Sequence, residues 1–408
     1  MKPVLFILFL FITTSSRAQL LKQQYKEDFQ YFWQQLHDYY AYMDKKETDW
    51  QAVKKIYEPA VDTITRTKSF VLLMEKVFNE IYDHHSNLNT NTMESQRLVP
   101  TGTDIWAEYI DDKPVITEVR KGFGADKVGL RAGMEIVSFK DVPIEKAILT
   151  YLPRSLKQTD KEAKDYALRV LLAGKFEDDR KITVKIGNTV KSFYPDRPVH
   201  MLRHHEYDGP VETRNYIGNI GYIRINNRLW DNALIPYFDS VLRSMDNTSS
   251  LILDLRETPS GGNTIVARSI LGSFITKEGF YQKHELPTQE KVFGVKRSWV
   301  ELVSPGDYVY TKPLVILVNH WTGSVGEGIA IGFDALERGT IVGTPMAQLN
   351  GAIYSYKMPN SGIGFSYAEE KLYHVNGEPR EHYVPPVLVE MTKQDKDDLI
   401  LNTALEIL

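Results

Sequence analysis

Residues 314–327 read LVILVNHWTGSVGE, and this stretch decides the class of fold. Its five apolar residues predict a buried strand, and the small residues after them predict a turn that opens a helix over residues 328–336. Such a turn exposes the hydroxyl of Ser324 and directs the N–H groups of the helix start toward developing negative charge. Because Thr322 interrupts the pattern, this is not the G-x-S-x-G turn of the α/β-hydrolases. Ser324 is therefore a candidate nucleophile, with a helix N-cap as the alternative.

The chain around this stretch alternates strand-like and helix-like segments. Apolar runs at residues 221–225 and 251–255 precede the run described above, and helix-like segments follow them at 233–245 and 267–275. Apolar runs separated by helices are what a sheet covered on both faces requires. Residues 196–408 are therefore expected to form an α/β domain.

A second glycine-containing turn follows one of these strands. Residues 251–262 read LILDLRETPSGG. Glycine lets a substrate backbone approach closely and leaves backbone N–H groups accessible. Gly261 or Gly262 is thus expected to join the N–H of Val325 in an oxyanion hole. An ordinary turn at a strand end is the alternative.

Residues 1–18 have the layout of a signal peptide. Lys2 precedes an apolar run over residues 4–12, and Ser16 and Ala18 supply the small side chains that a signal peptidase accepts. This run is too short to span a membrane, which takes about 20 residues in a helix. We expect cleavage after Ala18 and a periplasmic or secreted protein. A buried N-terminal helix is the alternative.

Composition narrows the classes of function. The 408 residues include no cysteine, which excludes a disulfide framework, a thiolate metal site and a cysteine nucleophile. Removing Lys2 and Arg17 with the leader lowers the 49 basic residues to 47 against 53 acidic ones, a formal charge of −6. Such a balance does not recruit nucleic acid. The hydrophobic fraction of 42% supports packed cores, and the length allows two or three domains.

Residues 19–97 are expected to form a helical unit. Aromatic and apolar residues recur at helical spacing over residues 29–40 and again over 70–81. The pattern stops at residues 83–88, DHHSNL, where polar turn formers predict a loop that can carry function.

Residues 98–195 change character and resemble a PDZ domain. Strand-like runs at 114–119 and 135–139 flank the sequence GFGADKVGLRAG at residues 122–133, which is similar to the short helix and G-L-x-x-G turn of such domains. The segment 161–172 is a candidate helix for a groove that binds an extended peptide. An unrelated β-rich insert with glycine turns is the alternative.

Several ordered segments together resemble the family of C-terminal processing peptidases. Residues 319–343 are similar to its S-A-S-E and V-V-G-E signature, and residues 251–262 to its D-L-R-x-N-P-G-G turn. The strand at 221–225 and the tail VPPVLV at 384–389 match in the same order. The resemblance implies a crotonase/ClpP-like α/β core with an N-terminal helical unit and an inserted PDZ-like domain.

The same resemblance implies a serine peptidase that cleaves unfolded or extended peptides by acyl transfer. Ser324 takes the place of the nucleophile, and Val325 with Gly261 or Gly262 takes that of the oxyanion hole. No cofactor and no metal are implied. The expected partner is a peptide or unfolded protein substrate, with no nucleic acid and no membrane anchor.

The general base departs from the Ser/Lys branch of this family. Leu349 stands where that branch has its lysine, and Lys357 is the nearest lysine downstream. The tricorn-like branch instead takes a histidine from an N-terminal D-G-H-[ST] segment, and residues 83–86, DHHS, are similar, with His85 at the histidine position. A neutral imidazole also suits proton transfer near pH 7 better than an unperturbed lysine. We expect His85 to be the base; a surface or helix-capping histidine is the alternative.

A histidine base usually has a partner that fixes its tautomer. In the tricorn-like branch a glutamate near the C-terminal end acts through a hydroxyl beside the histidine, and Glu381 is similar in position. Asp83 is a local competitor for this role. Glu327 is expected to support the helix start rather than to take part in catalysis.

Two other classes of function remain to be compared. Paired histidines stand at residues 84–85 and 204–205, but the H-E-x-x-H pattern of a zinc peptidase is missing. The other class is a non-catalytic relative that binds peptides or apolar ligands, because the interphotoreceptor retinoid-binding protein resembles this fold and binds apolar ligands. Side chains of Ser324 and His85 far apart would favour binding, and a pair within reach favours an enzyme.

Overall fold

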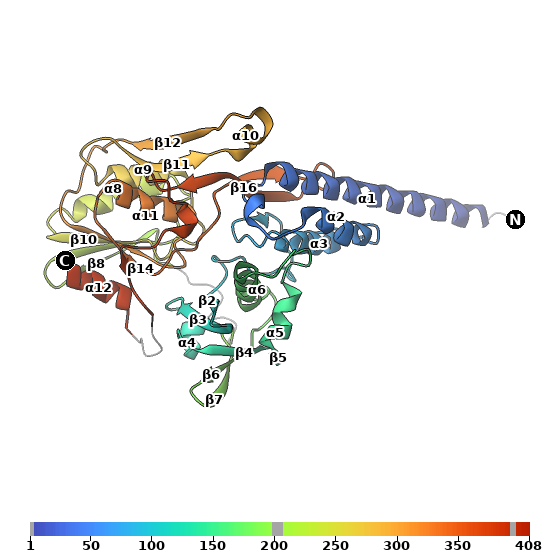
Figure 1. Ribbon diagram of the computed structural model, residues 1–408, viewed down its shortest axis with the longest axis horizontal. Coiled ribbons are helices and arrows are strands. Elements are labelled where there is room, and N and C mark those ends of the chain that lie inside the picture. The colour runs from blue at the N-terminus through green and yellow to red at the C-terminus, as the bar shows by residue number, and fades with distance from the viewer. Residues whose placement is uncertain (1–3, 198–206, 392–396) are drawn as a thin grey trace.

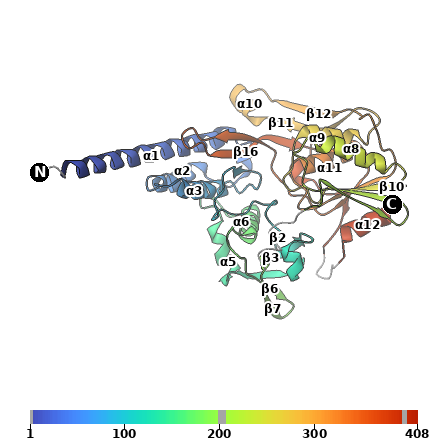
Figure 2. The same cartoon turned by 180° about the vertical axis from the view of Figure 1, so that it is seen from behind.

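The computed structural model describes residues 4–197, 207–391 and 397–408, with side chains from residue 21 onward. Figure 1 shows a helical part near the N-terminus, a small β-rich part and a larger α/β part. Seen from behind in Figure 2, the N-terminal end of α1 (Val4–Tyr39) extends outward beyond the rest of the helical part. Within the described residues, every helix is too short or too polar to cross a membrane.

The helical part confirms the helical spacing of residues 29–40 and 70–81. Besides α1 it contains α2 (Trp50–Val61), α3 (Thr67–Asn79) and the short helix η1 (Met43–Lys45). Its core also includes Phe365 and Tyr367, which belong to β16 (Gly364–Tyr373) in the last part of the chain. The helical part therefore does not pack on its own, because a distant strand completes its core.

An antiparallel sheet connects the helical part to the α/β part. Its order is β1-β16-β11-β12, with β15 paired to β16, and its other strands are β1 (Asn87–Leu88), β11 (Gly279–Glu285), β12 (Ser298–Val303) and β15 (Ala352–Lys357). Helix α10 (Pro287–Phe293) links β11 to β12. Strand β1 follows the loop at residues 83–86, and its pairing with Ser366 and Phe365 fixes that loop relative to the α/β part.

The β-rich part has the strand order β2-β3-β4-β6-β7, with β5 beside β4. The strands are β2 (Ile105–Ile110), β3 (Lys113–Val119), β4 (Glu135–Phe139), β5 (Val142–Pro143), β6 (Ile182–Ile186) and β7 (Thr189–Phe193). The helices are α4 (Gly124–Val128), α5 (Ile144–Ala147), η2 (Ile148–Thr150) and α6 (Lys161–Ala173). The strands expected at 114–119 and 135–139 and the helix expected at 161–172 are thus confirmed.

The α/β part contains a six-stranded sheet in the order β17-β14-β13-β10-β9-β8, parallel except at the β8 edge. The strands are β8 (Val211–Tyr216), β9 (Ile220–Ile225), β10 (Ser250–Asp254), β13 (Leu314–Val318), β14 (Thr340–Gly343) and β17 (Val387–Leu388). The helices are α8 (Leu234–Ser244), α9 (Thr264–Gly272), α11 (Val325–Ala335), η3 (Arg380–His382) and α12 (Leu399–Ile407). The mixed α/β fold with an N-terminal helical region is confirmed.

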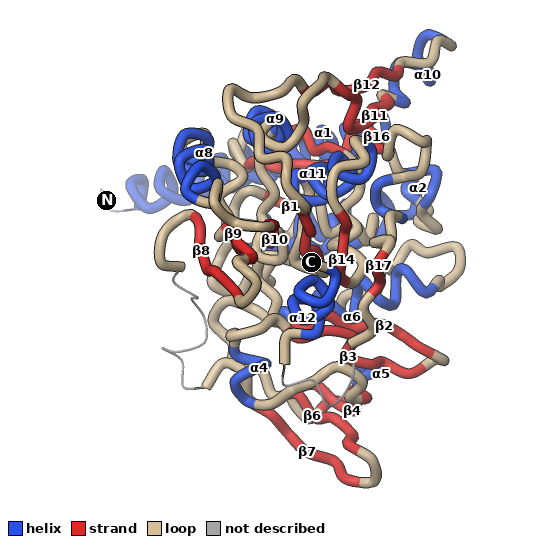
Figure 3. Tube along the Cα trace, turned by 90° about the vertical axis from the view of Figure 1, so that its left-hand side faces the viewer, coloured by secondary structure: helices blue, strands red, loops and turns tan. Residues whose placement is uncertain are grey.

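Both faces of this sheet are covered, which explains its continuous apolar strands. Leu251 and Leu253 pack into a core with α8, α9 and α11, whereas Ile252 packs on the opposite face with Ile400 and Leu401 of α12. Figure 3 shows α12 on the other side of the sheet from α8, α9 and α11. The five parallel strands, from β9 to β17, deliver their carboxyl ends to one edge of the sheet, where the turns after β10 and β13 lie.

The β-rich part packs against the turn after β13. Glu118, at the end of β3, accepts hydrogen bonds from Nδ2 of Asn319 at 2.9 Å and from Oγ1 of Thr344 at 2.8 Å. The indole N–H of Trp321 donates to the carbonyl of Thr103 at 2.8 Å. These side chains are buried, so the position of this turn depends on the β-rich part as well as on its own sheet.

Candidate active site

Ser324 stands between β13 and α11 with an unusual backbone conformation. Its φ of 51° and ψ of −110° lie in a region that side chains with a Cβ rarely adopt. The carboxylate of Glu327 accepts the N–H of Ser324 at 2.7 Å, which supports this turn. An ordinary N-cap has an extended backbone and bonds its hydroxyl to the helix N–H groups. Ser324 is the N-cap residue of α11 and forms a capping box with Glu327, and its hydroxyl also has a hydrogen bond to a side chain outside the helix.

That side chain is His85, whose Nε2 lies 3.0 Å from Oγ of Ser324. The other ring nitrogen, Nδ1, lies 2.7 Å from the carbonyl oxygen of Asn350. A carbonyl only accepts hydrogen bonds, so this contact assigns the ring proton to Nδ1. The lone pair of Nε2 therefore faces the hydroxyl of Ser324, which is the tautomer that a general base requires.

Asp83 holds the loop that carries this histidine. Its carboxylate accepts the backbone N–H of His85 at 2.9 Å, the hydroxyl of Ser86 at 2.7 Å and the hydroxyl of Tyr40 at 3.0 Å. These contacts fix the main chain of the loop and leave the imidazole ring to Asn350. Asp83 therefore does not bond the imidazole ring of His85. It affects the ring only through the electrostatic effect of its charge.

The environment of His85 keeps its imidazole neutral. Burial and, after it, the nearby guanidinium of Arg380 lower the pKa of His85 to about 4, although the charge of Asp83 opposes both. At pH 7 the ring is therefore unprotonated and able to accept a proton.

The glycine turn after β10 lies directly against Ser324. Gly261 has a φ of 61°, and a Cβ at this position would come within 2.5 Å of Cβ of Ser324. Its N–H donates to the carbonyl of Thr258 at 3.1 Å, so it is already used. Within the described residues, the N–H groups of Gly262 and Val325 have no acceptor. Of the two candidate glycines, Gly262 therefore retains an available donor, and Gly261 provides the close approach.

Glu327 is fully buried beneath the turn. It accepts the N–H groups of both Ser324 and Leu349, the latter at 3.2 Å, and burial raises its pKa to about 7. These bonds agree with the expected supporting role. The same carboxylate connects the nucleophile turn to the loop whose Asn350 carbonyl contacts His85.

Neither lysine-related position offers a base to Ser324. Leu349 is buried, and a Cβ added at Gly323 would lie 3.3 Å from its Cδ1, so an apolar side chain fills the space beside the turn. Lys357 is exposed at the end of β15, where it pairs in register with Gly364. This arrangement leaves His85 as the residue that contacts the hydroxyl.

Glu381 contacts a hydroxyl near the site, and its expected role through a hydroxyl stays a prediction. Its carboxylate accepts the hydroxyl of Tyr42 at 3.5 Å, and within the described residues neither Glu381 nor Tyr42 bonds to His85. Burial raises the pKa of Glu381. The ring nitrogen Nδ1 of His85 bonds the carbonyl of Asn350.

Two contacts of the site were not anticipated from the sequence. Arg380 donates to three carbonyls around the pair, and Asn350 contributes a main-chain oxygen rather than a side chain. The position of Arg380 next to Glu381 was the only available signal for it. The contribution of a backbone carbonyl cannot be recognised from the residue type, because every residue has one.

The paired histidines do not form a metal site in the described part of the chain. The ring of His84 stacks on Tyr166 with ring centroids 4.6 Å apart, whereas His85 turns toward Ser324. In residues 4–197, 207–391 and 397–408, no three potential metal ligands cluster together. His204, His205 and Glu206 lie outside the described residues.

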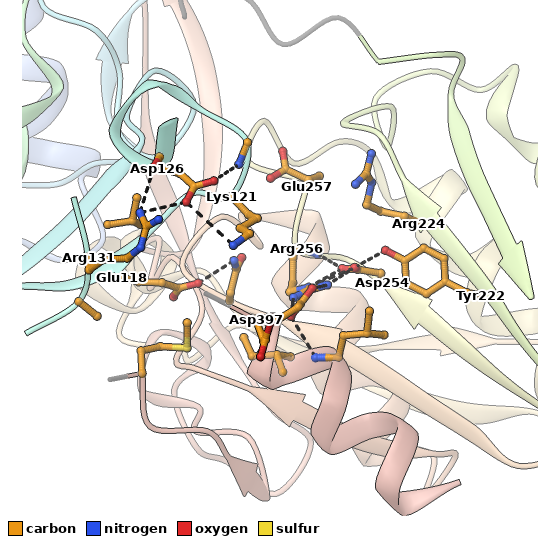
Figure 4. A pocket seen from close by; sticks show the side chains of 18 of the residues that line it. Glu118, Lys121, Asp126, Arg131, Tyr222, Arg224, Asp254, Arg256, Glu257 and Asp397 are labelled. Carbon is orange, nitrogen blue, oxygen red and sulfur yellow. Dashed lines mark hydrogen bonds and ion pairs between the residues drawn. The ribbon is translucent and has the colours of Figure 1, made fainter. Parts of the chain in front are cut away.

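A separate cavity of about 410 Å³ lies where the β-rich part, the sheet edge and α12 meet (Figure 4). Its charged side chains are largely paired with one another: Arg256 bonds Asp254 and Asp398, and Arg131 bonds Asp126. None of the residues that line it contacts Ser324 or His85 through a hydrogen bond in the described structure. The site formed by Ser324 and His85 therefore lies outside this cavity.

A serine and a neutral histidine at a helix start, beside free backbone N–H groups, define the site of a serine hydrolase. Residues 219–388 match the model of peptidase family S41, and residues 21–79 match the tricorn protease C1 domain. The chain belongs to peptidase family S41 and is a serine peptidase.

Solved structures show the same fold along nearly the whole chain. The mature form of CPAF covers 92% of this chain and 94% of its own, with a TM-score of 0.62 and 15% identity. The photosystem II D1 C-terminal processing protease covers 92% and 95%, with a TM-score of 0.57 and 16% identity. A protein from Parabacteroides merdae covers 94% and 96%, with a TM-score of 0.58 and 16% identity. At these identities the likeness concerns the fold.

Proposed function

We propose that this S41 peptidase is an endopeptidase in which Ser324 is the nucleophile and His85 the general base. His85 removes the proton of Ser324, and Oγ attacks the peptide carbonyl. The developing oxyanion accepts hydrogen bonds from the N–H groups of Val325 and Gly262. His85 then protonates the leaving amine, and water releases the acyl group by the same path. The distance of 3.0 Å between Nε2 and Oγ carries this proposal.

The substrate class follows from the fold and from the lack of a strong charge. We propose unfolded or extended peptides, because neither the net charge nor a basic or acidic block selects a partner by charge. Glu381 is retained in this proposal only as a buried carboxyl near the site. The crotonase/ClpP-like description of residues 196–408 and the PDZ-like description of residues 98–195 belong to the same proposal.

Export also belongs to the proposal. The layout of residues 1–18 supports a cleaved leader and a periplasmic or secreted enzyme. Amino-terminal sequencing of the protein made in a secreting host is expected to begin at Gln19, and a chain that keeps Lys2 would contradict export by this route.

The direct test of the nucleophile uses a fluorophosphonate probe, which reacts with activated serines without requiring a known substrate. The parent protein is expected to be labelled at Ser324, and Ser324→Ala is expected to lose both labelling and peptide hydrolysis. Ser260→Ala is the matched control, because Ser260 lies in the neighbouring glycine turn and its hydroxyl accepts only the side-chain amide of Asn227.

Peptide mapping of the labelled protein identifies the modified residue. Labelling that persists in Ser324→Ala would remove Ser324 as the nucleophile. A parent protein that is folded but not labelled would contradict the catalytic proposal as a whole.

A further inference from the structure

Arg380 lies where the loops of the Ser324–His85 pair meet. Its side chain is buried, and Nη2 donates to the carbonyls of Leu349 and Gly351, each at 2.9 Å. Nη1 donates to the carbonyl of Ser324 itself at 3.3 Å. One guanidinium thus contacts the main chain of the nucleophile and the loop opposite it.

The loop bound by this guanidinium is the one that orients the base. Leu349 and Gly351 stand on either side of Asn350, whose carbonyl accepts Nδ1–H of His85 at 2.7 Å. The donors of a guanidinium are held in a rigid planar fork, so the carbonyls that they bind keep fixed relative positions. Arg380 therefore links the main chain of Ser324 to the segment that binds the ring of His85.

In the described structure, neither nearby carboxylate orients the ring of His85. Asp83 bonds the main chain of His85, and Glu381 bonds Tyr42. In a serine–histidine–acid triad the acid orients the imidazole ring directly. We propose that Arg380 is the positioning residue of this pair, which orients His85 by holding the peptide segment that binds its ring. The inference rests on the proposed function and adds a residue to it.

The charge of Arg380 has a second consequence. The charged groups around His85 are Arg380 on η3, Asp83 on its own loop and Glu327 on α11, which lies 3.7 Å from Arg380. Burial, followed by Arg380, lowers the pKa of His85 to about 4, and Asp83 opposes this shift. The fork and the charge therefore make separate contributions, which two different substitutions can distinguish.

The experiment compares Arg380→Lys, which keeps the charge but loses the fork, with Arg380→Met, which loses both. Arg338→Met is the matched control, because Arg338 also donates to three carbonyls, those of Phe274, Tyr310 and Lys312, without contacting the pair. The rate constant for fluorophosphonate labelling of Ser324 is measured from about pH 3.5 to about pH 8, a range that includes the pKa of the general base. Histidine NMR of each variant with Ser324→Ala gives the pKa of His85 independently of activity.

We expect Arg380→Lys to lower the labelling rate about 10- to 100-fold with little change in its acidic limb, because misplacement of the base costs rate. Arg380→Met is expected to lower the rate at least as much and to move the acidic limb upward by about one pH unit, since a repelling charge is gone. The NMR titration of His85 is expected to shift by the same amount. Arg338→Met should leave the labelling rate and the acidic limb unchanged.

Labelling of Arg380→Lys at the parent rate would overturn the positioning role while leaving the proposed function intact. An unshifted titration of His85 in Arg380→Met would overturn the electrostatic part. If Arg380→Met does not fold, Arg380→Lys still decides the positioning role, because lysine keeps the buried charge beside Glu327. A parent protein that is not labelled would instead overturn the proposed function, and the inference with it.

Discussion

At the scale of single residues, the site pairs a strained serine with an unusually supported histidine. Ser324 is forced to a positive φ by the turn and by Glu327, which presents its hydroxyl outside the helix. His85 bonds a neutral carbonyl where many serine hydrolases have a carboxylate. A carbonyl fixes the tautomer but stabilises an imidazolium less than an anion does. We therefore expect a base that remains available in acid and is only moderately strong.

The two adjacent histidines allow a sharp test of the base. His85→Ala is expected to lower kcat by at least about 100-fold, because a positioned general base contributes this much or more. His84→Ala is expected to cost far less, since its ring stacks on Tyr166 and makes no bond to Ser324. The measurement is peptide hydrolysis under saturating substrate. Equal and small effects of the two substitutions would show that neither histidine is the base.

The sequence located the residues whose side-chain chemistry is distinctive. A strand–turn–helix pattern made Ser324 a candidate, the family resemblance implied both Ser324 and the His85 of the DHHS segment, and the structure places Nε2 of His85 3.0 Å from Oγ of Ser324. Arg380 and Asn350 were missed because their contributions depend on carbonyls and on long-range loop packing, which residue types do not encode. The role of Glu381 through a hydroxyl stays a prediction, because it accepts the hydroxyl of Tyr42, which makes no hydrogen bond to His85 in the described structure.

At the scale of elements, helix α6 covers the outer edge of β2, where a PDZ-like unit would add a peptide strand. Oδ1 of Asp165 accepts the N–H of Tyr109 at 2.7 Å, and Nε of Arg169 donates to the carbonyl of Ala107 at 3.2 Å. The sequence predicted this helix but not β2, and it did not reveal that the helix already bonds the strand. A peptide that adds to this edge has to displace these side chains.

This arrangement predicts how the enzyme responds to the end of its substrate. In the parent protein, amidating the C-terminus of a cleaved peptide is expected to change KM little, because the edge of β2 is occupied. Asp165→Ala frees the N–H of Tyr109 and is expected to make KM lower for the free acid than for the amide, with kcat similar. Asp141→Ala, on an exposed turn of the same unit, is the control.

Steady-state kinetics on one peptide in its two forms provides the measurement. A parent enzyme that strongly prefers the free acid would show that the edge opens readily and that the unit already delivers substrate ends. An Asp165→Ala variant without any preference would show that the unit serves as a spacer.

At the scale of the whole molecule, buried histidines and buried glutamates change the stability of the fold with pH in opposite directions. Burial lowers the pKa of His85 and His320 to about 4 from an ordinary 6.5, so their contribution to stability is full above pH 6.5 and is lost as the pH falls to 4. Burial raises the pKa of Glu118 and Glu327 to about 7 from 4.5, so their contribution is full below pH 4.5 and is lost as the pH rises through 7.

Between pH 4.5 and 6.5 the pH-dependent contributions of the two histidines and the two glutamates to stability nearly cancel. Above pH 6.5 the contribution of the two glutamates dominates. We expect Glu118→Gln, which imitates the protonated carboxyl, to reduce the fall of Tm between pH 6 and 8. Glu177→Gln, at an exposed carboxylate, is the control. Calorimetry at both pH values measures the effect. A fall of Tm as large as in the parent would show that Glu118 is ionised in the folded protein at pH 6.

The pairing of His85 with Ser324 joins residues 239 positions apart, and Arg380 follows the serine by a further 56. During synthesis the base therefore leaves the ribosome long before the nucleophile, and the guanidinium that aligns them comes last. At about 5–20 residues per second the final stretch alone takes about 3–11 s. A nascent chain thus carries both reactive side chains without their alignment, and a truncated product that ends before Arg380 does not acquire it. On the proposed role of Arg380, we expect the pair to become competent to cleave only after Arg380 has been synthesised.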